Sequence, residues 1–205
     1  CKNLDIESLE VRTRESEDVK DYLQELKFEI IKIDFPEELK EIRELLKIIY
    51  NKKVQELKNR KLLFSIPNKR TILELQQRIM RIIAAGNRNF NILSGASACS
   101  QVIKLQHALE LLETQTLYSF HEYLQNLFGQ AKAGKSKAVQ NLVKQPEFNK
   151  AYTKLIELIA KKQEHPKLIK LREIVEADIK ANAKEKIIIF AQFRDTVTKI
   201  CKTLN

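Results

Sequence analysis

The sequence predicts a mainly α-helical protein, in which a long helical domain lies between two short partial α/β segments. Gly and Pro are scarce, with four of each in 205 residues, and this favours long helices with few turns. Through most of the chain, apolar residues recur at spacings of three and four, the period of one helix face. Two short apolar runs near the ends lack this period and indicate strands. We therefore divide the chain into residues 1–35, 36–163 and 164–205.

The first segment, residues 1–35, is expected to hold one short helix and one strand. Ser16 precedes two acidic residues, which is typical of a capped helix N-terminus, and this helix would run to about Leu23. Residues 28–33 then form an apolar run with the character of a strand.

The central segment, residues 36–163, is expected to form five helices. Pro36 suits the first turn of a helix, and Thr71 can cap the next one. Gly86 and Asn87 form a helix stop signal, after which an Asn-, Ser- and Gly-rich stretch predicts a loop. The expected elements in chain order are helices at about 36–58 and 71–85, a loop at 86–97, a long helix at 98–128, a break at 129–137, and helices at 137–145 and 147–162.

The last segment, residues 164–205, begins with His165 and Pro166, which open a helix to about residue 183. The run from Ile187 to Ala191 does not alternate, which is the pattern of a parallel strand covered on both faces. Such a strand needs neighbouring strands, and the rest of the sequence offers almost none. With a final helix at 194–204, this predicts a strand-to-helix unit that is cut off, so we expect the chain to be part of a larger protein.

The net charge of +10 is concentrated in the central segment, which has 22 basic and 11 acidic residues. This asymmetry favours a polyanionic partner, most often nucleic acid. A solvated lysine-rich surface is the alternative interpretation. The candidate contacts are basic residues of the central segment, namely Lys52, Lys53, Lys58, Arg60, Lys61, Lys69, Arg70, Arg78, Arg81, Arg88, Lys104, Lys132, Lys135 and Lys137.

Aromatic residues are sparse in this basic stretch, since only Phe64 and Phe90 occur between Asn51 and Leu109. Stacking on bases is therefore not the expected mode of binding. Contacts to the phosphate backbone are expected instead, which implies little sequence specificity. Arg78 and Arg81 lie three residues apart, and we expect them to share an exposed helix face.

One segment matches a nucleotide-binding pattern, but its context argues against that function. Residues 129–136 fit the phosphate-binding loop G-x-x-x-x-G-K-[ST]. That loop needs a buried strand before it, so that backbone N–H groups converge on phosphate. Residues 118–128 instead have the spacing of an amphipathic helix, so we interpret the match as a polar turn between helices.

Cysteine and histidine patterns give neither a metal site nor a catalytic set. Cys1, Cys99 and Cys201 lie far apart, and we expect packing or surface cysteines in a reduced, intracellular protein. The three histidines have no cysteine or carboxylate partners at ligand spacing, so each is expected to be an ordinary surface or core residue. No apolar run approaches the roughly 18 residues of a membrane-spanning helix, and we expect no membrane partner.

The sequence resembles superfamily 2 helicases at both ends. Residues 187–196, Ile-Ile-Ile-Phe-Ala-Gln-Phe-Arg-Asp-Thr, resemble motif IV at the start of the second RecA-like domain. Residues 14–22, Arg-Glu-Ser-Glu-Asp-Val-Lys-Asp-Tyr, and residues 28–36 resemble the end of the first RecA-like domain. Between them, residues 105–115 and 122–134 resemble the helical insert of the archaeal Hef helicase/nuclease, whose eukaryotic relative is the Fanconi anaemia M-type translocase.

The resemblance implies that the parent protein is an ATP hydrolase that remodels forked or branched DNA in repair at replication forks. ATP and Mg would be bound by the parent protein, between its RecA-like domains, and no cofactor is expected in this chain. DNA would be the main partner, replication or repair proteins would be further ones, and the location would be cytoplasmic and nucleoid-associated. Motif IV carries over onto Phe190, Gln192, Phe193 and Arg194, which would line the interdomain or nucleic-acid face.

Two functions therefore stay open at the level of sequence. The chain is either a DNA-binding insert of such a helicase, or a helical protein-interaction or spacer module without direct DNA contact. Convergence of the basic residues on one face of the fold would favour the first function, and scattered basic residues would favour the second.

Overall fold

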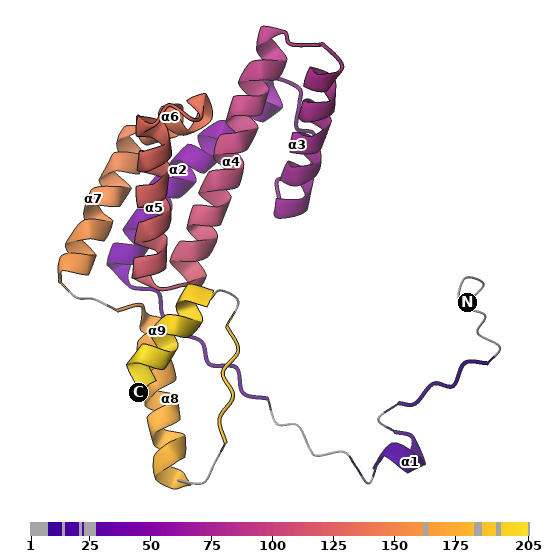
Figure 1. The fold of residues 1–205 in the computed structure, drawn as a ribbon, viewed down its shortest axis with the longest axis vertical. Helices are drawn as coiled ribbons and strands as arrows, with labels where there is room; N and C mark the ends of the chain where they lie inside the picture. Colours follow the sequence, from indigo (N-terminus) through magenta and orange to yellow (C-terminus); the bar gives the residue numbers. More distant parts are fainter. Residues whose placement is uncertain are drawn as a thin grey trace. The chain divides into compact units, whose positions relative to one another are not determined.

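The structure is a computed structural model of the chain. It describes residues 8–13, 15–20, 22, 28–161, 164–182, 186–191 and 194–204, which fall into two units, Cys1–Lys32 and Ile33–Asn205. The first unit contains the single-turn helix α1 (Glu17–Lys20). The mainly α prediction is confirmed, because every regular element among the described residues is a helix (Figure 1). The helices of the second unit are α2 (Glu37–Asn59), α3 (Lys69–Ala84), α4 (Phe90–Thr114), α5 (Leu117–Lys132), α6 (Lys137–Val143), α7 (Pro146–Ala160), α8 (Pro166–Ala181) and α9 (Arg194–Leu204).

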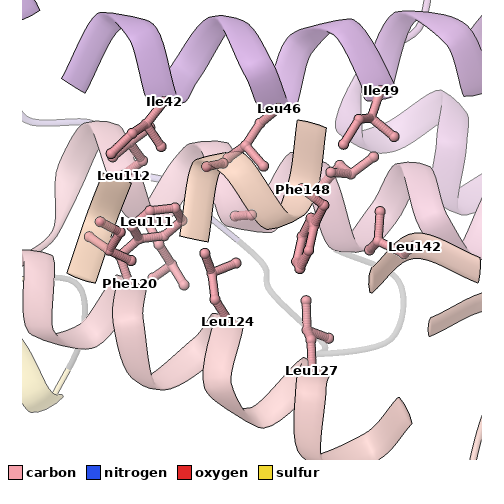
Figure 2. Packing of buried hydrophobic residues seen from close by; sticks show 14 of the residues in the cluster. Ile42, Leu46, Ile49, Leu111, Leu112, Phe120, Leu124, Leu127, Leu142 and Phe148 are labelled. Carbon is pink, nitrogen blue, oxygen red and sulfur yellow. The ribbon is translucent and has the colours of Figure 1, made fainter. Parts of the chain in front are cut away.

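The larger of two cores is built from the first half of α2, the second half of α4, and helices α5, α6 and α7; we call this part the main bundle (residues 36–50 and 105–161). Its apolar stripes follow the helical period, so Ile42, Leu46 and Ile49 of α2 all point inward. Figure 2 shows these side chains facing the layer that holds Phe148 and Leu124.

A second, smaller core lies beyond the main bundle, and we call this part the outer lobe (residues 51–104). It packs the second half of α2, helix α3 and the first half of α4 around Leu57, Ile72 and Val102. Figure 1 shows α3 lying beside the first half of α4, with the loop between them at the outer end. Because α2 and α4 run through both cores, the outer lobe is a direct extension of the main bundle.

The prediction of a loop at residues 86–97 is wrong, because α4 begins at Phe90. Asn89 caps this helix by accepting a hydrogen bond from the Ile92 N–H at 2.9 Å, so the asparagine is a start signal here. Gly95 is buried, and a Cβ built on it would clash with Leu62 Cδ1. The small residues that indicated a loop thus allow close packing between α4 and the segment after α2.

The single helix expected at 98–128 is also wrong, since the chain breaks at Gln115 and Thr116. Thr116 caps α5 by accepting a hydrogen bond from the Ser119 N–H at 3.2 Å. In the same way, the cap of α3 is Asn68, while Thr71 completes a reciprocal capping box with it. The helices expected at 36–58, 137–145, 147–162, 165–183 and 194–204 are confirmed to within two residues at each end.

Neither strand prediction holds in the described chain. Residues 28–33 and 186–191 do not pair as strands with any described segment. A strand needs a backbone partner, and none of the described segments supplies one. Most apolar side chains of the two runs are consequently exposed, including Phe28 and Phe190.

Other expectations concern the cysteines and the membrane. Cys99 is buried and Cys201 is exposed, as expected for packing and surface residues, while Cys1 lies outside the described residues. Within the described part of the chain, no helix is both long and apolar enough to span a membrane.

Candidate nucleic-acid interface

Positive charge is unevenly divided between the two cores. The outer lobe carries eleven basic residues against two acidic ones, whereas the main bundle carries ten basic against nine acidic. The outer lobe is therefore the part of the fold with a strong net positive potential.

Arg60 ties the end of α2 to the first turns of α4. Its guanidinium donates to Glu56 Oε1 at 3.0 Å, to Ser94 Oγ at 2.9 Å and to Asn91 Oδ1 at 3.2 Å. It also lies over the ring of Phe90, 5.8 Å from the ring centroid. These contacts occupy the donors of Arg60 inside the lobe, so its main role is structural and it is a weaker candidate for a phosphate contact.

Lys61 ends α2 in a backbone conformation that favours glycine. Its φ is 55°, its N–H donates to Lys58 O at 2.8 Å, and the next N–H, of Leu62, donates to Leu57 O at 3.0 Å. This is the Schellman arrangement of a helix C-terminus. Helices α3 and α5 end in the same way, but with Gly86 and Gly134 at the left-handed position. A lysine there costs roughly 1 kcal/mol relative to glycine, and it places a charged side chain beside the outer end.

Several candidate residues of the outer lobe are exposed and make no ion pair or side-chain hydrogen bond with any described residue. Four of them flank the outer end, where α2 and α3 finish and α4 begins. An unpaired cation at the surface can accept a phosphate without first losing a protein partner, so these residues are the best candidates for contact. They are Lys58, Lys61, Arg81 and Arg88 at the outer end, with Lys52 two turns before the end of α2.

Other candidates in the outer lobe have partners within the protein. Lys53 pairs with Glu56 at 2.9 Å, Arg70 with Glu74 at 2.8 Å, and Lys69 with Glu110 at 3.0 Å. Arg78 is exposed like Arg81, but its guanidinium donates to the Leu62 backbone carbonyl, so the two arginines do not present equivalent groups. Lys104 is half-buried in the middle of α4, where its carbonyl accepts from Tyr123 Oη at 3.2 Å.

The remaining lysines lie elsewhere, at the turn between α5 and α6 in the main bundle. Lys132 ends α5, Lys135 lies in the turn, and Lys137 begins α6, all three exposed. The structure thus gathers one group of basic residues in the outer lobe and leaves this second group on another pair of helices.

The same turn contains residues 129–136, which match the nucleotide-binding pattern, and its structure shows whether they form a phosphate-binding loop. Gly129 is inside α5, and Ser136 caps α6 by accepting from the Val139 N–H at 3.5 Å. A helix therefore precedes the turn in place of a buried strand, and the interpretation as a turn between helices is confirmed. The residues do not fit a nucleotide phosphate.

Motif IV lies partly outside the described residues, because Gln192 and Phe193 are not among them. Phe190 is 92% exposed, and Arg194 is the exposed first residue of α9. The described residues of the motif are thus largely exposed to solvent, and Phe190 also lines a pocket with Thr116 and His165.

His165 lies at the start of α8, as its sequence context predicts, and it is a buried structural residue. It is 3% exposed and caps α8, with Nδ1 accepting from the Lys167 N–H at 3.3 Å and Nε2 donating to Leu112 O at 3.3 Å. Burial lowers the pKa of His165 to about 4, against an ordinary value of 6.5. The neutral imidazole therefore joins the start of α8 to the end of α4.

Phe90 and Phe64 are too few in the sequence to predict stacking on bases. In the structure their side chains are 81% and 79% exposed in the outer lobe. Position in the first turn of α4 does not by itself predict this exposure, because Ile92 in the same turn is buried.

Comparisons with known proteins agree with this fold. Residues 38–164 match the family described as "Putative ATP-dependent RNA helicase, helical bundle". A Methanocaldococcus jannaschii protein named "Putative ATP-dependent RNA helicase" is 34% identical over all of this chain and 25% of its own length. The Mus musculus "Fanconi anemia group M protein homolog" is 27% identical over 98% of this chain and 12% of its own.

A solved structure gives the same relationship in three dimensions. The crystal structure of the Pyrococcus furiosus Hef helicase domain superposes with a TM-score of 0.79 at 34% identity, covering 97% of this chain and 42% of that one. The chain thus spans a quarter or less of the curated relatives it matches. The resemblance to Hef and Fanconi anaemia M proteins is confirmed, and the chain belongs to the helicase helical-bundle family, as the helical domain of a superfamily 2 helicase.

Proposed function

We propose that this chain is the nucleic-acid-binding insert of an ATP-dependent helicase that acts on forked or branched DNA. One observation carries the proposal: the outer lobe has eleven basic residues against two acidic ones, and four of its unpaired cations flank one end. A polyanion is the partner that such a surface attracts, and each phosphate it neutralises releases counterions.

The backbone around the basic residues of the outer lobe is fixed by hydrogen bonds, which supports binding of a duplex in one position. Lys61 is held by the hydrogen bonds that end α2, and Arg60 fixes that end against α4. Arg88 precedes the capped first turn of α4. Contacts of this kind fix the position of a duplex without reading bases, so preference would come from the geometry of a branch.

The ATP hydrolysis of the proposed parent protein belongs to other parts of it. Residues 129–136 do not fit a nucleotide, as shown above, and the described residues contain no group of three or more metal-ligating side chains. We infer that ATP and Mg bind to RecA-like domains of the longer protein, while this chain holds the substrate. DNA repair at replication forks and association with the nucleoid follow from the same proposal.

The choice of DNA over RNA rests on likeness to relatives whose names differ. Hef and the Fanconi anaemia M homologue resemble this chain, but the archaeal relative is named an RNA helicase. Charge alone attracts either polymer, so the two must be compared directly.

The test is a titration of the 205-residue chain with forked, duplex and single-stranded DNA and with a forked RNA of the same sequence. Binding should weaken steeply between about 50 and 200 mM salt. We expect forked DNA to bind most tightly. Absence of binding at the lowest salt, or equal affinity for all four polymers, contradicts the proposal.

A protein-interaction or spacer function has one observation in its favour. Leu73 and Met80 lie seven residues apart on α3, so they share a face, and both are exposed. If the chain binds no nucleic acid, this apolar face becomes the better candidate. Replacement of both residues by Asp would then identify a protein partner by loss of its binding.

A further inference from the structure

Phe90 presents an aromatic ring to solvent at the outer end of the lobe. It is the first residue of α4, and 81% of its surface is exposed. Phe148 and Phe120, by contrast, are completely buried in the main bundle. The ring of Phe90 is therefore open to contact with a partner, at the end of the lobe where the unpaired cations lie.

The ring of Phe90 has one face occupied by a fixed cation. The Arg60 guanidinium lies over it at 5.8 Å, in the range of a cation–π contact. Arg60 is itself held by Glu56, Ser94 and Asn91, so it cannot easily leave the ring. The exposure of Phe90 therefore comes from the opposite face and the edge, where a second flat group can stack.

The positive charges near Phe90 favour a ligand in which negatively charged groups flank the flat aromatic group. Arg88 lies two residues before it, and Lys61 follows Arg60 at the end of α2. The first turn of α4 contains no acidic residue, and its N–H groups add partial positive charge. A nucleobase between its phosphates is a flat aromatic group flanked by negative charges, so it matches these features.

We propose that Phe90 stacks on a nucleobase exposed at the branch point of forked DNA, while Lys61 and Arg88 hold the phosphates on either side of that base. The inference rests on the proposed function and extends it from the phosphate backbone to a base. A base inside a duplex is covered by its neighbours, whereas a base at a branch has a free face. Stacking would therefore favour branched DNA over uniform duplex without reading the sequence.

The experiment measures binding of the 205-residue chain to a DNA fork that carries 2-aminopurine at the branch point. Stacking on Phe90 should change the fluorescence of that base on binding. We expect Phe90→Ala to remove the change and to weaken fork binding about fivefold or more, the low end of the range for base–aromatic stacking. Binding to uniform duplex should change less than twofold, and Phe90→Tyr should restore both signals.

The matched control is Phe64→Ala, because Phe64 is almost as exposed, lies in the same lobe and has no described cation over its ring. It should leave the fluorescence change in place. Equal losses from both variants, or an unchanged fork affinity in Phe90→Ala, would overturn the stacking role. If Phe90→Ala leaves the fork affinity unchanged but Lys61→Ala with Arg88→Ala weakens it, the proposed function is still supported.

A failure of the proposed function gives a different result. Wild-type chain that binds no fork at low salt contradicts both inferences at once. If Phe90→Ala then abolishes binding of an acidic peptide with an aromatic residue, the surface recognises protein and the nucleobase proposal is wrong.

Discussion

The main bundle and the outer lobe share two helices but differ in what their side chains do. The main bundle buries Phe120 and Phe148 in the larger core, and its ion pair Lys154–Glu41 joins α7 to α2. The outer lobe has the smaller core, yet it holds unpaired cations and exposed phenylalanines. We infer from this comparison that the main bundle holds the larger buried core, while the outer lobe is the candidate binding surface.

The largest expected effect is on stability, from Phe148→Ala in the main bundle. Phe148 is fully buried and its ring centroid lies 5.6 Å from that of Phe128. Removal of the ring should lower the free energy of unfolding by about 3–5 kcal/mol, measured by urea unfolding with circular dichroism. Fork affinity of the folded variant should stay unchanged, and a loss of affinity without a loss of stability would break the comparison.

A nearly equal effect is expected from acid, through His165. In the folded chain its pKa is about 4, and in the unfolded chain it returns to about 6.5, so the unfolded state binds the proton first as pH falls. The stability contributed by neutral His165 is fully present above pH 6.5 and is lost as pH falls to about 4. The loss amounts to about 3 kcal/mol and is measured by urea unfolding at several pH values.

The matched variant for this prediction is His165→Asn. Asparagine can still accept from the Lys167 N–H through Oδ1, although its shorter side chain does not replace the bond from Nε2 to Leu112 O, and it does not titrate in this range. Its stability should therefore change less than that of the wild type between pH 6.5 and 4. Hydrogen exchange should show the acid effect at the start of α8 and not in the outer lobe, since His165 has no contact there. The same acid dependence in both proteins would contradict the assignment.

The next effect concerns binding, in the triple variant Lys58→Ala, Lys61→Ala and Arg88→Ala. Each lost phosphate contact should reduce the salt dependence of log affinity by about one unit, so the three together reduce it by about three. Near 0.1 M salt, the affinity for forked DNA should fall on the order of a hundredfold. Circular dichroism should show an unchanged fold, because these side chains have no partner among the described residues.

The control removes the same charge from the main bundle, in Lys132→Ala, Lys135→Ala and Lys137→Ala. These lysines are equally exposed but lie at the turn between α5 and α6. We expect a smaller loss of affinity than from the outer triple. Equal losses would mean that the interface covers both regions, and the division drawn above would have to be abandoned.

Sequence reasoning predicted the parts of the fold that depend on local patterns. The apolar spacing along α2 and the His165-Pro166 start of α8 were sufficient, because a helix face and a cap are encoded within a few residues. The start of α4 was missed for a non-local reason. Gly95 is compatible with a helix because it lies against Leu62, more than thirty residues earlier in the chain.

The candidate site was predicted as a list of basic residues, and the structure divides that list. Whether a lysine is free or paired depends on which helices pack together: Lys69 meets Glu110 of α4, while Lys58 meets no described partner. The exposed ring of Phe90 was not predicted, because the number of aromatic residues in a segment contains no information on their exposure. Pairing and exposure are properties of packing, and spacing within a single sequence does not encode them.

The smallest expected effect is also the most specific, because Lys61→Gly should change stability and binding in opposite directions. Lys61 occupies the left-handed position where α3 and α5 have Gly86 and Gly134. Glycine relieves the strain, so the free energy of unfolding should rise by about 1 kcal/mol. The lost charge should lower the salt dependence of fork binding by about one unit.

Lys61→Ala separates the two causes, because alanine removes the charge but retains the strain of a left-handed β-carbon. It should bind forked DNA as weakly as Lys61→Gly, with a stability close to that of the wild type. If the wild type has a higher free energy of unfolding than Lys61→Gly, Lys61 has a structural role. If instead glycine stabilises the fold and weakens binding, the outer lobe retains a strained residue because of the contact it makes, as the comparison with the main bundle requires.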